Sequence, residues 1–379
     1  MPSVFNWQIR RELDYPYEHE RPQKQFAMVM DLNKCIACQT CTVACKTTWT
    51  PGRGQEYMLW NNVETKPYGY YPLGWDVKLL ELLEDGQKWV DESYKGPTLF
   101  DAAPDGEPLA KWLPEEYDWA FPNIGEDEIS EPVELGTVMD SLPQMAWMFY
   151  LPRICNHCTY PACVAACPRK AIYKRPEDGV VLIDPERCEG YQECVAACPY
   201  KKSIFNAVAR ISQKCIGCYP KIENGYQPQC VTTCIGRIRL QGFISPPDRI
   251  RPDNPIDFLV HVKRVALPLY PQSGLEPNVY YIPPIHVPKP FLRQMFGPGV
   301  DRAIDTYQRM RQGDEPEIQA LLHLFGATER ITHSFRVVGD EAISFDEQGR
   351  EIVRVPLVER YQERPHEDPQ LEVVRQDVP

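Results

Sequence analysis

Long apolar runs are missing from this sequence, and none reaches the roughly 18 residues that a membrane-spanning helix needs. The first residues, MPSVFNWQIRRELDYPYEHERP, also lack the apolar segment of a secretory signal peptide. The net charge is −12, whereas proteins that bind nucleic acid generally need basic surfaces. Nucleophile–base pairs, phosphate loops and dinucleotide fingerprints are absent from the sequence as well. We therefore expect no direct membrane span, no nucleic-acid partner and no catalytic site of the chain's own.

Cysteine, by contrast, is abundant: the chain has 15, and all of them fall into four short groups. The odd count and the C-x2-C spacings disfavour a disulfide framework. Zinc sites usually pair two C-x2-C motifs around one ion, a pattern that only the last group resembles. The first three groups end in a C-x3-C step, and two continue into Cys-Pro, which closes the ligand runs of bacterial ferredoxins. Four such groups in one chain predict iron–sulfur clusters.

The spacing also predicts which cysteines share a cluster, because in two-cluster ferredoxins the fourth cysteine of each run ligates the cluster of the other run. The second and third groups are separated by two short apolar runs around a PEDG turn, which predict a β-hairpin. These two groups form one pair, so the first and last groups form the other. The predicted ligand sets are Cys35, Cys38, Cys41 and Cys234 for cluster A; Cys45, Cys215, Cys218 and Cys230 for cluster B; Cys155, Cys158, Cys163 and Cys198 for cluster C; and Cys167, Cys188 and Cys194 for cluster D.

Cluster D is one thiolate short, and in CEGYQEC the residue Tyr191 stands where the second cysteine of the run would be. A bulky ring there would occupy the volume of a fourth iron. We therefore predict one 3Fe-4S cluster at D beside three 4Fe-4S clusters at A, B and C, with Tyr191 filling the fourth position without being a ligand. Two alternatives stay open: the phenolate of Tyr191 ligates a fourth iron, or that iron is open to a substrate, as in a dehydratase.

Lysine and arginine outnumber aspartate and glutamate between Leu151 and Leu240, although the whole chain is acidic. Thiolate-bound clusters are anionic, and uncompensated charge in a low-dielectric interior is costly. We expect some basic residues beside the ligands to offset this charge and to raise the reduction potentials. His157, inside CNHC, is expected to be structural, because its group already has four cysteines. The basic residues concerned are Lys46, Arg169, Lys170, Lys201, Lys202, Lys214, Arg237 and Arg239.

These patterns favour an α+β chain with two nested bacterial-ferredoxin-like modules, one inserted in the other, a long irregular insertion and a C-terminal extension. Trp49, Trp60 and Trp147 are expected to shield the clusters or to contact partners. In the extension, VDRAIDTYQRM and PEIQALLHLFG predict helices, VVGDEAISFDEQGREIVRVPL predicts a hairpin, and a Pro-rich segment near 261–291 is expected to lie along another surface of this chain or of a partner. The predicted divisions are an N-terminal arm at 1–25, the first module (clusters A and B) at 26–50 plus 205–245, the insertion at 51–150, the second module (clusters C and D) at 151–204, and an extension contacting partner subunits at 246–379.

Several stretches resemble one family. DLNKCIACQTCTVACKTTWT, EYMLWNNVETKP, YLPRICNHCTYPACVAACPRKAIYKRPEDGVVLID, KCIGCYPKIENG and ALPLYPQSGLEPNVYYIPP are similar to the iron–sulfur β subunits of the dimethyl sulfoxide reductase superfamily. The group in question contains respiratory nitrate reductase, nitrite oxidoreductase, and the ethylbenzene and dimethylsulfide dehydrogenases. The stretch FLVHVKRVALPLYPQSGLEPNVYYIPPIHVPKPF resembles nitrite oxidoreductases of the periplasmic type most. An aromatic residue at the position of Tyr191 is part of the family's pattern.

The resemblance implies an electron-transfer subunit whose four clusters form a row. A molybdenum–bis-pterin α subunit would lie beside cluster A, and a haem b γ subunit or a c-type cytochrome beside cluster D. The complex would be a nitrite oxidoreductase or nitrate reductase, with the ethylbenzene, dimethylsulfide, chlorate and selenate enzymes as alternatives. Co-export with the α subunit would place the chain in the periplasm, while the cytoplasmic face of the inner membrane stays open. From the residues alone, a self-contained enzyme with an open iron at the Cys188 cluster and a zinc-structured interaction protein also remain possible.

Overall fold

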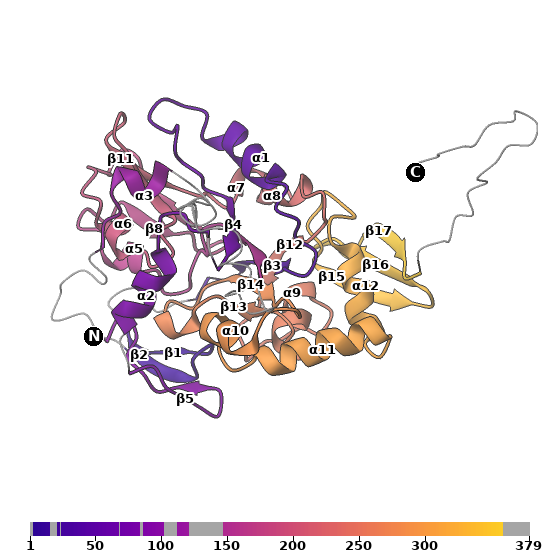
Figure 1. Ribbon diagram of the computed structural model, residues 1–379. Helices are drawn as coiled ribbons and strands as arrows, with labels where there is room; N and C mark the ends of the chain where they lie inside the picture. The colour runs from indigo at the N-terminus through magenta and orange to yellow at the C-terminus, as the bar shows by residue number, and fades with distance from the viewer. Residues whose placement is uncertain are drawn as a thin grey trace, which may run out of the picture.

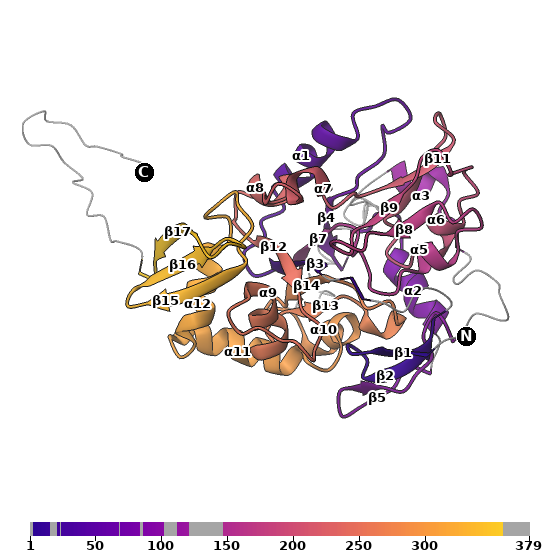
Figure 2. The same ribbon diagram turned by 180° about the vertical axis from the view of Figure 1, so that it is seen from behind.

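The computed structural model describes residues 3–15, 21, 22, 24–67, 69–83, 86–101, 112–120 and 147–358. Parts of the predicted N-terminal arm, of the predicted insertion and of the C-terminal extension lie outside the described residues. The cysteine-bearing segments occupy the upper part of the molecule in Figure 1, and the long helices of the C-terminal extension lie below them. The view from behind, in Figure 2, shows the same two-part arrangement on either side of a central sheet.

The central sheet has four strands in the order β12–β3–β14–β13. Strand β3 pairs antiparallel with β12 and parallel with β14, and β14 pairs antiparallel with the short β13. Residues that are more than 200 positions apart in the sequence, such as Ala27 and Gly242, thus lie side by side. The strands are β3 (Gln25–Asp31), β12 (Arg239–Ile244), β13 (Leu267–Pro268) and β14 (Val279–Ile282).

Strand β3 separates two hydrophobic cores, and all seven of its residues are buried. Successive side chains of a strand point to opposite faces. Phe26, Met28 and Met30 accordingly pack into one core, and Ala27 and Val29 into the other. Because both faces of the sheet are covered, the strand has the near-continuous apolar sequence FAMVM instead of an alternating one.

Short helices and hairpins carry the cysteine groups. Helix α1 packs against α8, and α5 packs against α6, so each helix contact joins two groups that are distant in the sequence. The hairpin predicted between the second and third groups is confirmed, because β8 and β9 pair antiparallel. The elements are α1 (Thr40–Trp49), α5 (Ala162–Ala165), β8 (Ile172–Lys174), β9 (Val181–Ile183), α6 (Glu193–Ala197), β10 (Ser203–Asn206), β11 (Ile211–Lys214), α7 (Tyr219–Ile222) and α8 (Gln229–Thr232).

The described part of the predicted insertion is more regular than the sequence analysis expects. Strand β4 pairs antiparallel with β7, directly before the second cysteine group, and a helix and a hairpin follow β4. Prolines and turn residues interrupt the apolar periodicity by which these elements could be predicted from the sequence. Strand β4 pairs with β7, which is too distant in the sequence for a local pattern to indicate the pairing. The elements are β4 (Asn62–Lys66), α2 (Trp75–Leu83), β5 (Trp89–Val90), β6 (Ser93–Tyr94), α3 (Glu116–Ala120) and β7 (Phe149–Arg153), beside the N-terminal hairpin of β1 (Ser3–Asn6) and β2 (Arg11–Asp14).

The C-terminal extension forms part of the chain's own core. Its Pro-rich segment contributes β13 and β14 to the central sheet. Both predicted helices are confirmed, and so is the hairpin around EQG, which a preceding strand extends to three strands that pack on α12. The elements are α9 (Pro255–Asp257), the π-helix η2 (Phe258–Val262), the short η3 (Pro271–Ser273), α10 (Lys289–Phe296), α11 (Val300–Gln312), α12 (Pro316–Leu324), β15 (Ser334–Val338), β16 (Glu341–Phe345) and β17 (Glu351–Pro356). Over the described residues, no helix has the length and apolar character needed to cross a bilayer.

Candidate cofactor sites

Four cavities lie among the cysteine-bearing loops. Each one gathers a different set of cysteines, and together they include all fifteen. These sets coincide with the groupings that the spacing predicts, although the ligands of any cluster stay a prediction. Cavity A is lined by Cys35, Cys38, Cys41 and Cys234; cavity B by Cys45, Cys215, Cys218 and Cys230; cavity C by Cys155, Cys158, Cys163 and Cys198; and cavity D by Cys167, Cys188 and Cys194 together with Tyr191.

The four loops share a backbone turn. In each loop, the residue before the second position of the C-x2-C step has a left-handed backbone, with φ of 52° at Ala37, 42° at His157, 71° at Gly190 and 63° at Gly217. Non-glycine residues adopt this conformation only where the surrounding structure requires it. The turn also directs backbone N–H groups at the sulfurs: the amide of Gly217, for example, lies 3.4 Å from Sγ of Cys215.

Tyr191 follows the left-handed Gly190, so it occupies the loop position that a cysteine holds in the other three loops. Its side chain lines cavity D and is 59% exposed. Cavity D therefore offers three thiols and one phenol ring at its mouth, where the other cavities offer four thiols.

The cavities form a row in the order A, B, C, D. Helix α1 supplies Cys41 to cavity A and Cys45 to cavity B, and α5 with the residues that follow it supplies Cys163 to cavity C and Cys167 to cavity D. Cavities B and C meet at Gly217, where an added Cβ would lie 3.5 Å from Nε2 of His157. The two ends of the row reach the surface, because Cys38 in cavity A is exposed and Tyr191 lies at cavity D.

His157 has the structural surroundings that the sequence analysis expects. Its side chain is fully buried, and its Nδ1 accepts a hydrogen bond from the backbone N–H of Val181 at 3.0 Å. Burial, together with the nearby Lys214 and Lys174, holds the pKa of His157 well below its ordinary value, so the ring is neutral. The ring thereby fixes the loop of cavity C to strand β9.

The basic residues beside the ligands divide into two kinds. Four of them are buried: Lys201, Lys202, Lys214 and Arg239. The other four are half-buried or exposed, and Arg169, for example, forms an exposed ion pair with Glu189 at 3.0 Å. Solvent screens the charge of the exposed ones. Burial lowers the pKa of Lys201 to about 8 and that of Lys202 well below its ordinary value, whereas Arg239 keeps its charge beside the cysteines.

Arg239 and Trp49 contact cysteine sulfurs directly. Nη2 of Arg239 donates to Sγ of Cys41 at 3.1 Å in cavity A, and Nε1 of Trp49 donates to Sγ of Cys218 at 3.2 Å in cavity B. Trp49 and the buried Trp60 both line cavity B, as expected of shielding residues. Trp147, for which we also expect either shielding of a cluster or contact with a partner, packs against aromatic rings of β7 and α10.

Burial makes the unligated thiols weak acids. It raises the pKa of Cys35 to about 11 and that of Cys230 to about 12, and it raises those of Cys158 and Cys163 well above the ordinary value. Neighbouring cysteines in the same cavity oppose ionisation further, because several thiolates would repel one another. These four thiols are therefore expected to ionise when a positively charged inorganic centre binds, and this binding releases protons. Cys38 in cavity A differs, because a hydrogen bond from Thr40 lowers its pKa.

A buried ion-pair cluster, which the sequence analysis missed, supports the loop of cavity C. Glu64 in β4 accepts a hydrogen bond from Nε of Arg153 in β7 at 2.6 Å, and its second oxygen lies 3.2 Å from Nζ of Lys66. Burial alone would raise the pKa of Glu64, but Arg153, Lys66 and Lys202 outweigh burial and lower this pKa to about 2. Arg153 also donates to the backbone oxygen of Tyr200, so this cluster connects the segment before α5 with the segment after α6.

The donor sets fit iron–sulfur clusters better than single metal ions. A zinc ion holds all of its sulfur ligands at about 2.3 Å, so those ligands must converge on one point. Among the described residues, no three cysteine, histidine, aspartate or glutamate side chains converge as ligands of one ion do. Cavities lined by cysteine thiols, with backbone N–H groups directed at the sulfurs, match the surroundings of a larger inorganic centre.

The comparisons with known proteins agree with this assignment. Residues 146–243 match the family described as a 4Fe-4S dicluster domain. The chain is 44% identical over 310 residues to selenate reductase subunit beta of Thauera selenatis, an alignment that covers 75% of this chain and 90% of that protein. It is 44% identical over 327 residues to respiratory nitrate reductase subunit beta of Haloferax mediterranei, covering 76% and 86% of the two chains. It is 31% identical over 359 residues to respiratory nitrate reductase 1 beta chain of Escherichia coli, covering 69% and 70%.

Three observations indicate the same family. They are the cysteine-lined cavities, the match to a dicluster domain, and relatives that are 31–44% identical over most of their length. The sequence resemblance is thereby confirmed, and the fold is a mixed helix–strand structure with a ferredoxin-like 4Fe-4S domain. The chain belongs to the iron–sulfur β subunits of the dimethyl sulfoxide reductase superfamily, which transfer electrons within oxidoreductase complexes and have no catalytic site of their own.

Proposed function

We propose that this chain holds 4Fe-4S clusters in cavities A, B and C and a 3Fe-4S cluster in cavity D. We further propose that it carries electrons between a molybdenum–bis-pterin α subunit and a haem b γ subunit or a c-type cytochrome. The observation that carries the proposal is the division of the fifteen cysteines over the four cavities, with Tyr191 at the position of the missing sixteenth. Clusters bound there would supply one-electron redox chemistry, and the chain itself supplies the thiols, the hydrogen bonds and the buried positive charges.

The two ends of the cavity row suit the two partners. Ile36, which lines cavity A, is 63% exposed, and Ile235, which follows Cys234, is 65% exposed, so two apolar side chains are exposed at this end. Tyr191 is exposed at cavity D, while the cysteines of cavity B are buried. Exposed apolar residues at a redox site are typical of a protein–protein contact. We assign the end at cavity A to the α subunit and the end at cavity D to the haem partner.

We interpret the architecture as two nested ferredoxin-like modules. The packing of α1 on α8 and of α5 on α6 supports this interpretation, since each contact joins the two runs that would exchange their fourth cysteines. The module boundaries would be 26–50 plus 205–245 and 151–204. The extension at 246–379 would contact partner subunits, although its described part also completes the central sheet.

A nitrite oxidoreductase or nitrate reductase is the complex that we propose for the chain. The support is the sequence resemblance, together with relatives that are named as subunits of nitrate, selenate and chlorate reductases. A periplasmic location, reached by export together with the α subunit, rests on the resemblance alone. Fractionation of cells with and without the α subunit tests this location: the chain should reach the periplasm only when the α subunit is present.

Metal analysis tests the cofactor proposal. The full-length chain, purified without oxygen, should contain about 15 irons and 16 acid-labile sulfides, because three four-iron clusters and one three-iron cluster have that composition. Electron paramagnetic resonance of the oxidised chain should show the three-iron signal. Sixteen irons without that signal would contradict the assignment of cavity D, and stoichiometric zinc without sulfide would contradict all four sites.

A further inference from the structure

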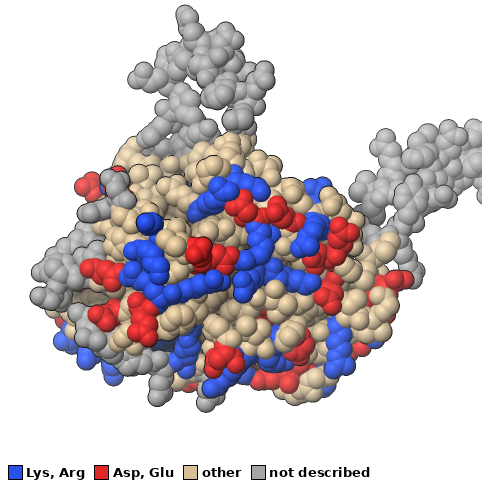
Figure 3. Space-filling view, turned by 90° about the horizontal axis from the view of Figure 1, so that it is seen from below, with Lys and Arg blue, Asp and Glu red and all other residues tan. Residues whose placement is uncertain are grey.

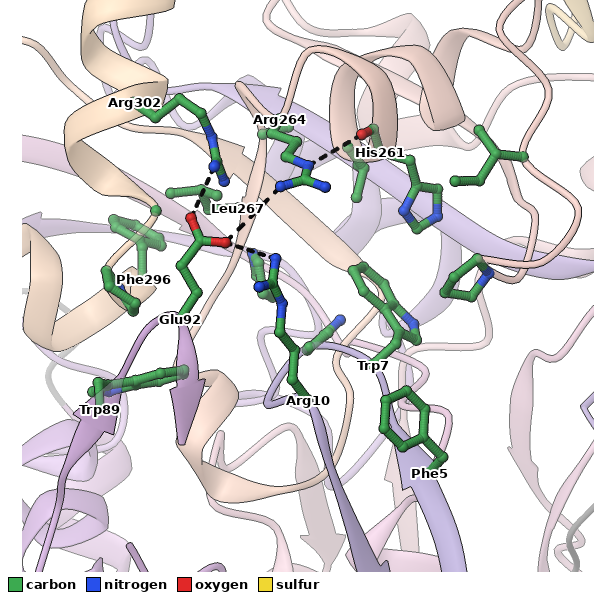
Figure 4. Close-up of a pocket in the computed structure, with 18 residues that line it drawn as sticks. Phe5, Trp7, Arg10, Trp89, Glu92, His261, Arg264, Leu267, Phe296 and Arg302 are labelled. Atoms are coloured by element: carbon green, nitrogen blue, oxygen red, sulfur yellow. Dashed lines mark hydrogen bonds and ion pairs between the residues drawn. The ribbon is translucent and has the colours of Figure 1, made fainter. Parts of the chain in front are cut away.

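A fifth cavity, of about 410 Å³, lies away from the cysteine row and shares no lining residue with cavities A to D. It is formed where the N-terminal hairpin, the β5–β6 hairpin, the π-helix η2 and helix α11 meet (Figure 4). Its volume is within the range of small-ligand pockets, which are mostly apolar and contain a few convergent polar groups.

Three arginines converge on one carboxylate in this cavity. Glu92 lies 2.6 Å from Arg10, 2.8 Å from Arg302 and 3.9 Å from Arg264. Glu92 is the only carboxylate among the described residues that line the cavity, so the cluster has an excess of two positive charges. All four side chains are between 31% and 47% exposed, which leaves the guanidinium groups able to receive a further anion. Figure 4 shows the three guanidinium groups directed at the carboxylate from three sides.

The backbone holds these charged residues in unfavourable conformations. Glu92 and Asp91 form the two-residue turn between β5 and β6, with φ of 63° and 46°, where glycine or asparagine would be preferred. Arg10 has a φ of 53° and Arg264 a φ of 51°. Left-handed non-glycine residues cost free energy and cluster at functional sites. A π-helix, which is also frequent at functional sites, ends at Val262, two residues before Arg264.

Aromatic rings form the walls beside the charges. In Figure 4, Trp89 and Phe296 lie on one side of the carboxylate, and Phe5 and Trp7 lie on the other. Phe5 is 56% exposed, so part of this apolar wall has no partner within the described chain. Figure 3 views the molecule from below and shows lysine and arginine side chains gathered across the middle of this face, with carboxylates between them.

We propose that this cavity binds a small organic anion, in which a phosphate or carboxylate group is attached to a planar or apolar body. The anionic group would bridge Arg302 and Arg264. Arg264 lies 3.9 Å from Glu92 and is the least tightly paired of the three arginines, so it would gain most from a bound anion. The body of the ligand would lie between the aromatic walls. Arginine suits this task because its planar fork binds two oxygens of one anion at a time. The site is separate from the cluster row, so the ligand would bind without contacting a cysteine.

Phenyl phosphate is a suitable probe, tested by isothermal titration calorimetry on the full-length, cluster-loaded chain. The wild type should bind phenyl phosphate more tightly than either inorganic phosphate, which lacks the body, or benzamide, which lacks the charge. Arg302→Met should weaken binding by about tenfold or more, the effect of one lost charge-assisted hydrogen bond. Glu92→Gln should tighten binding several-fold, because the competing carboxylate is removed. The visible absorption of the clusters verifies that each variant is folded.

Arg309→Met is the matched control, since Arg309 lies in the same helix, pairs with Glu315 at 3.1 Å and does not line the cavity. This variant should bind phenyl phosphate as the wild type does. The proposal is overturned if the wild type binds no phenyl phosphate at millimolar concentration, or if inorganic phosphate binds equally well. It is also overturned if Arg302→Met and Arg309→Met have the same effect, or if Glu92→Gln weakens binding.

Discussion

Arg239 and Cys41 are in direct contact, since Nη2 of the guanidinium lies 3.1 Å from Sγ of the cysteine. A second guanidinium nitrogen, Nη1, donates a hydrogen bond to Oδ1 of Asn61 at 2.7 Å, so two hydrogen bonds fix the position of the guanidinium group. Arg239 is almost fully buried, in strand β12 of the central sheet. A permanent positive charge is therefore fixed at the wall of cavity A, where solvent cannot screen it.

We predict that Arg239→Met lowers the reduction potential of the cluster in cavity A. Loss of the positive charge and of the hydrogen bond to sulfur both disfavour the more negative, reduced form. For a charge about 5 Å away at an effective dielectric constant of about 20, the Coulomb energy corresponds to a shift on the order of 100 mV. A redox titration followed by electron paramagnetic resonance measures this shift.

Arg237→Met is the control for this prediction, because Arg237 lies two residues earlier and is exposed. Its removal should change the potential far less, since water screens the charge. Arg239→Lys should recover part of the wild-type potential by restoring the charge without the two-sided hydrogen bonding. Equal shifts in Arg237→Met and Arg239→Met would show that burial of the charge is not what sets the potential.

A second prediction concerns stability. Glu64→Gln should reduce the free energy of unfolding by about 3–5 kcal/mol, because the change leaves the buried Arg153 without its counter-charge, whereas Lys66 keeps Asp76 at 2.8 Å. Urea denaturation followed by circular dichroism measures the loss. Glu341→Gln breaks an exposed ion pair with Arg354 and should cost no more than about 1 kcal/mol. If both variants lost the same small amount, the buried pair would have no special role.

The same carboxylate gives a pH prediction with a definite sign. The pKa of Glu64 is about 2 in the folded chain, against an ordinary value of 4.5. Because the folded-state pKa is the lower one, the ionised group stabilises the fold fully above pH 4.5 and loses this effect as the pH falls towards 2. The stability difference between the wild type and Glu64→Gln should therefore shrink by about 3 kcal/mol over this window. Urea titrations at several pH values test this, and a difference that stays constant with pH would refute it.

Local spacing explains why the cysteine sets could be predicted from the sequence. The first three cysteines of a run, such as Cys155, Cys158 and Cys163, wrap one small volume with a few residues, so the pattern of spacings encodes the geometry directly. The predicted hairpin between the second and third groups and helices α11 and α12 were accessible for the same reason, because their periodicity is local.

Long-range contacts explain what the sequence did not reveal. Glu64 and Arg153 are 89 positions apart, and no local pattern marks either as a member of a buried pair. Strand β14 lies parallel to β3 after more than 200 intervening residues, which is why its Pro-rich surroundings suggested a peripheral segment. The burial of the eight basic residues beside the ligands also depends on long-range packing. Four of the eight are buried in the structure, and Arg239 is one of them.

The last prediction concerns Tyr191, whose loop position is equivalent to that of Cys158 in the second group. Tyr191→Cys supplies a fourth thiol at cavity D, so the iron content should rise by about one per chain and the three-iron signal should disappear. The potential at this site should fall, because the cluster type changes from a three-iron to a four-iron cluster. Tyr191→Phe keeps the ring and removes only the hydroxyl, so it should retain the three-iron signal. A phenolate ligand to a fourth iron would give the opposite pattern: a four-iron cluster in the wild type that is lost in Tyr191→Phe. The pair of variants therefore distinguishes a ring that excludes iron by its volume from one that binds iron by its oxygen.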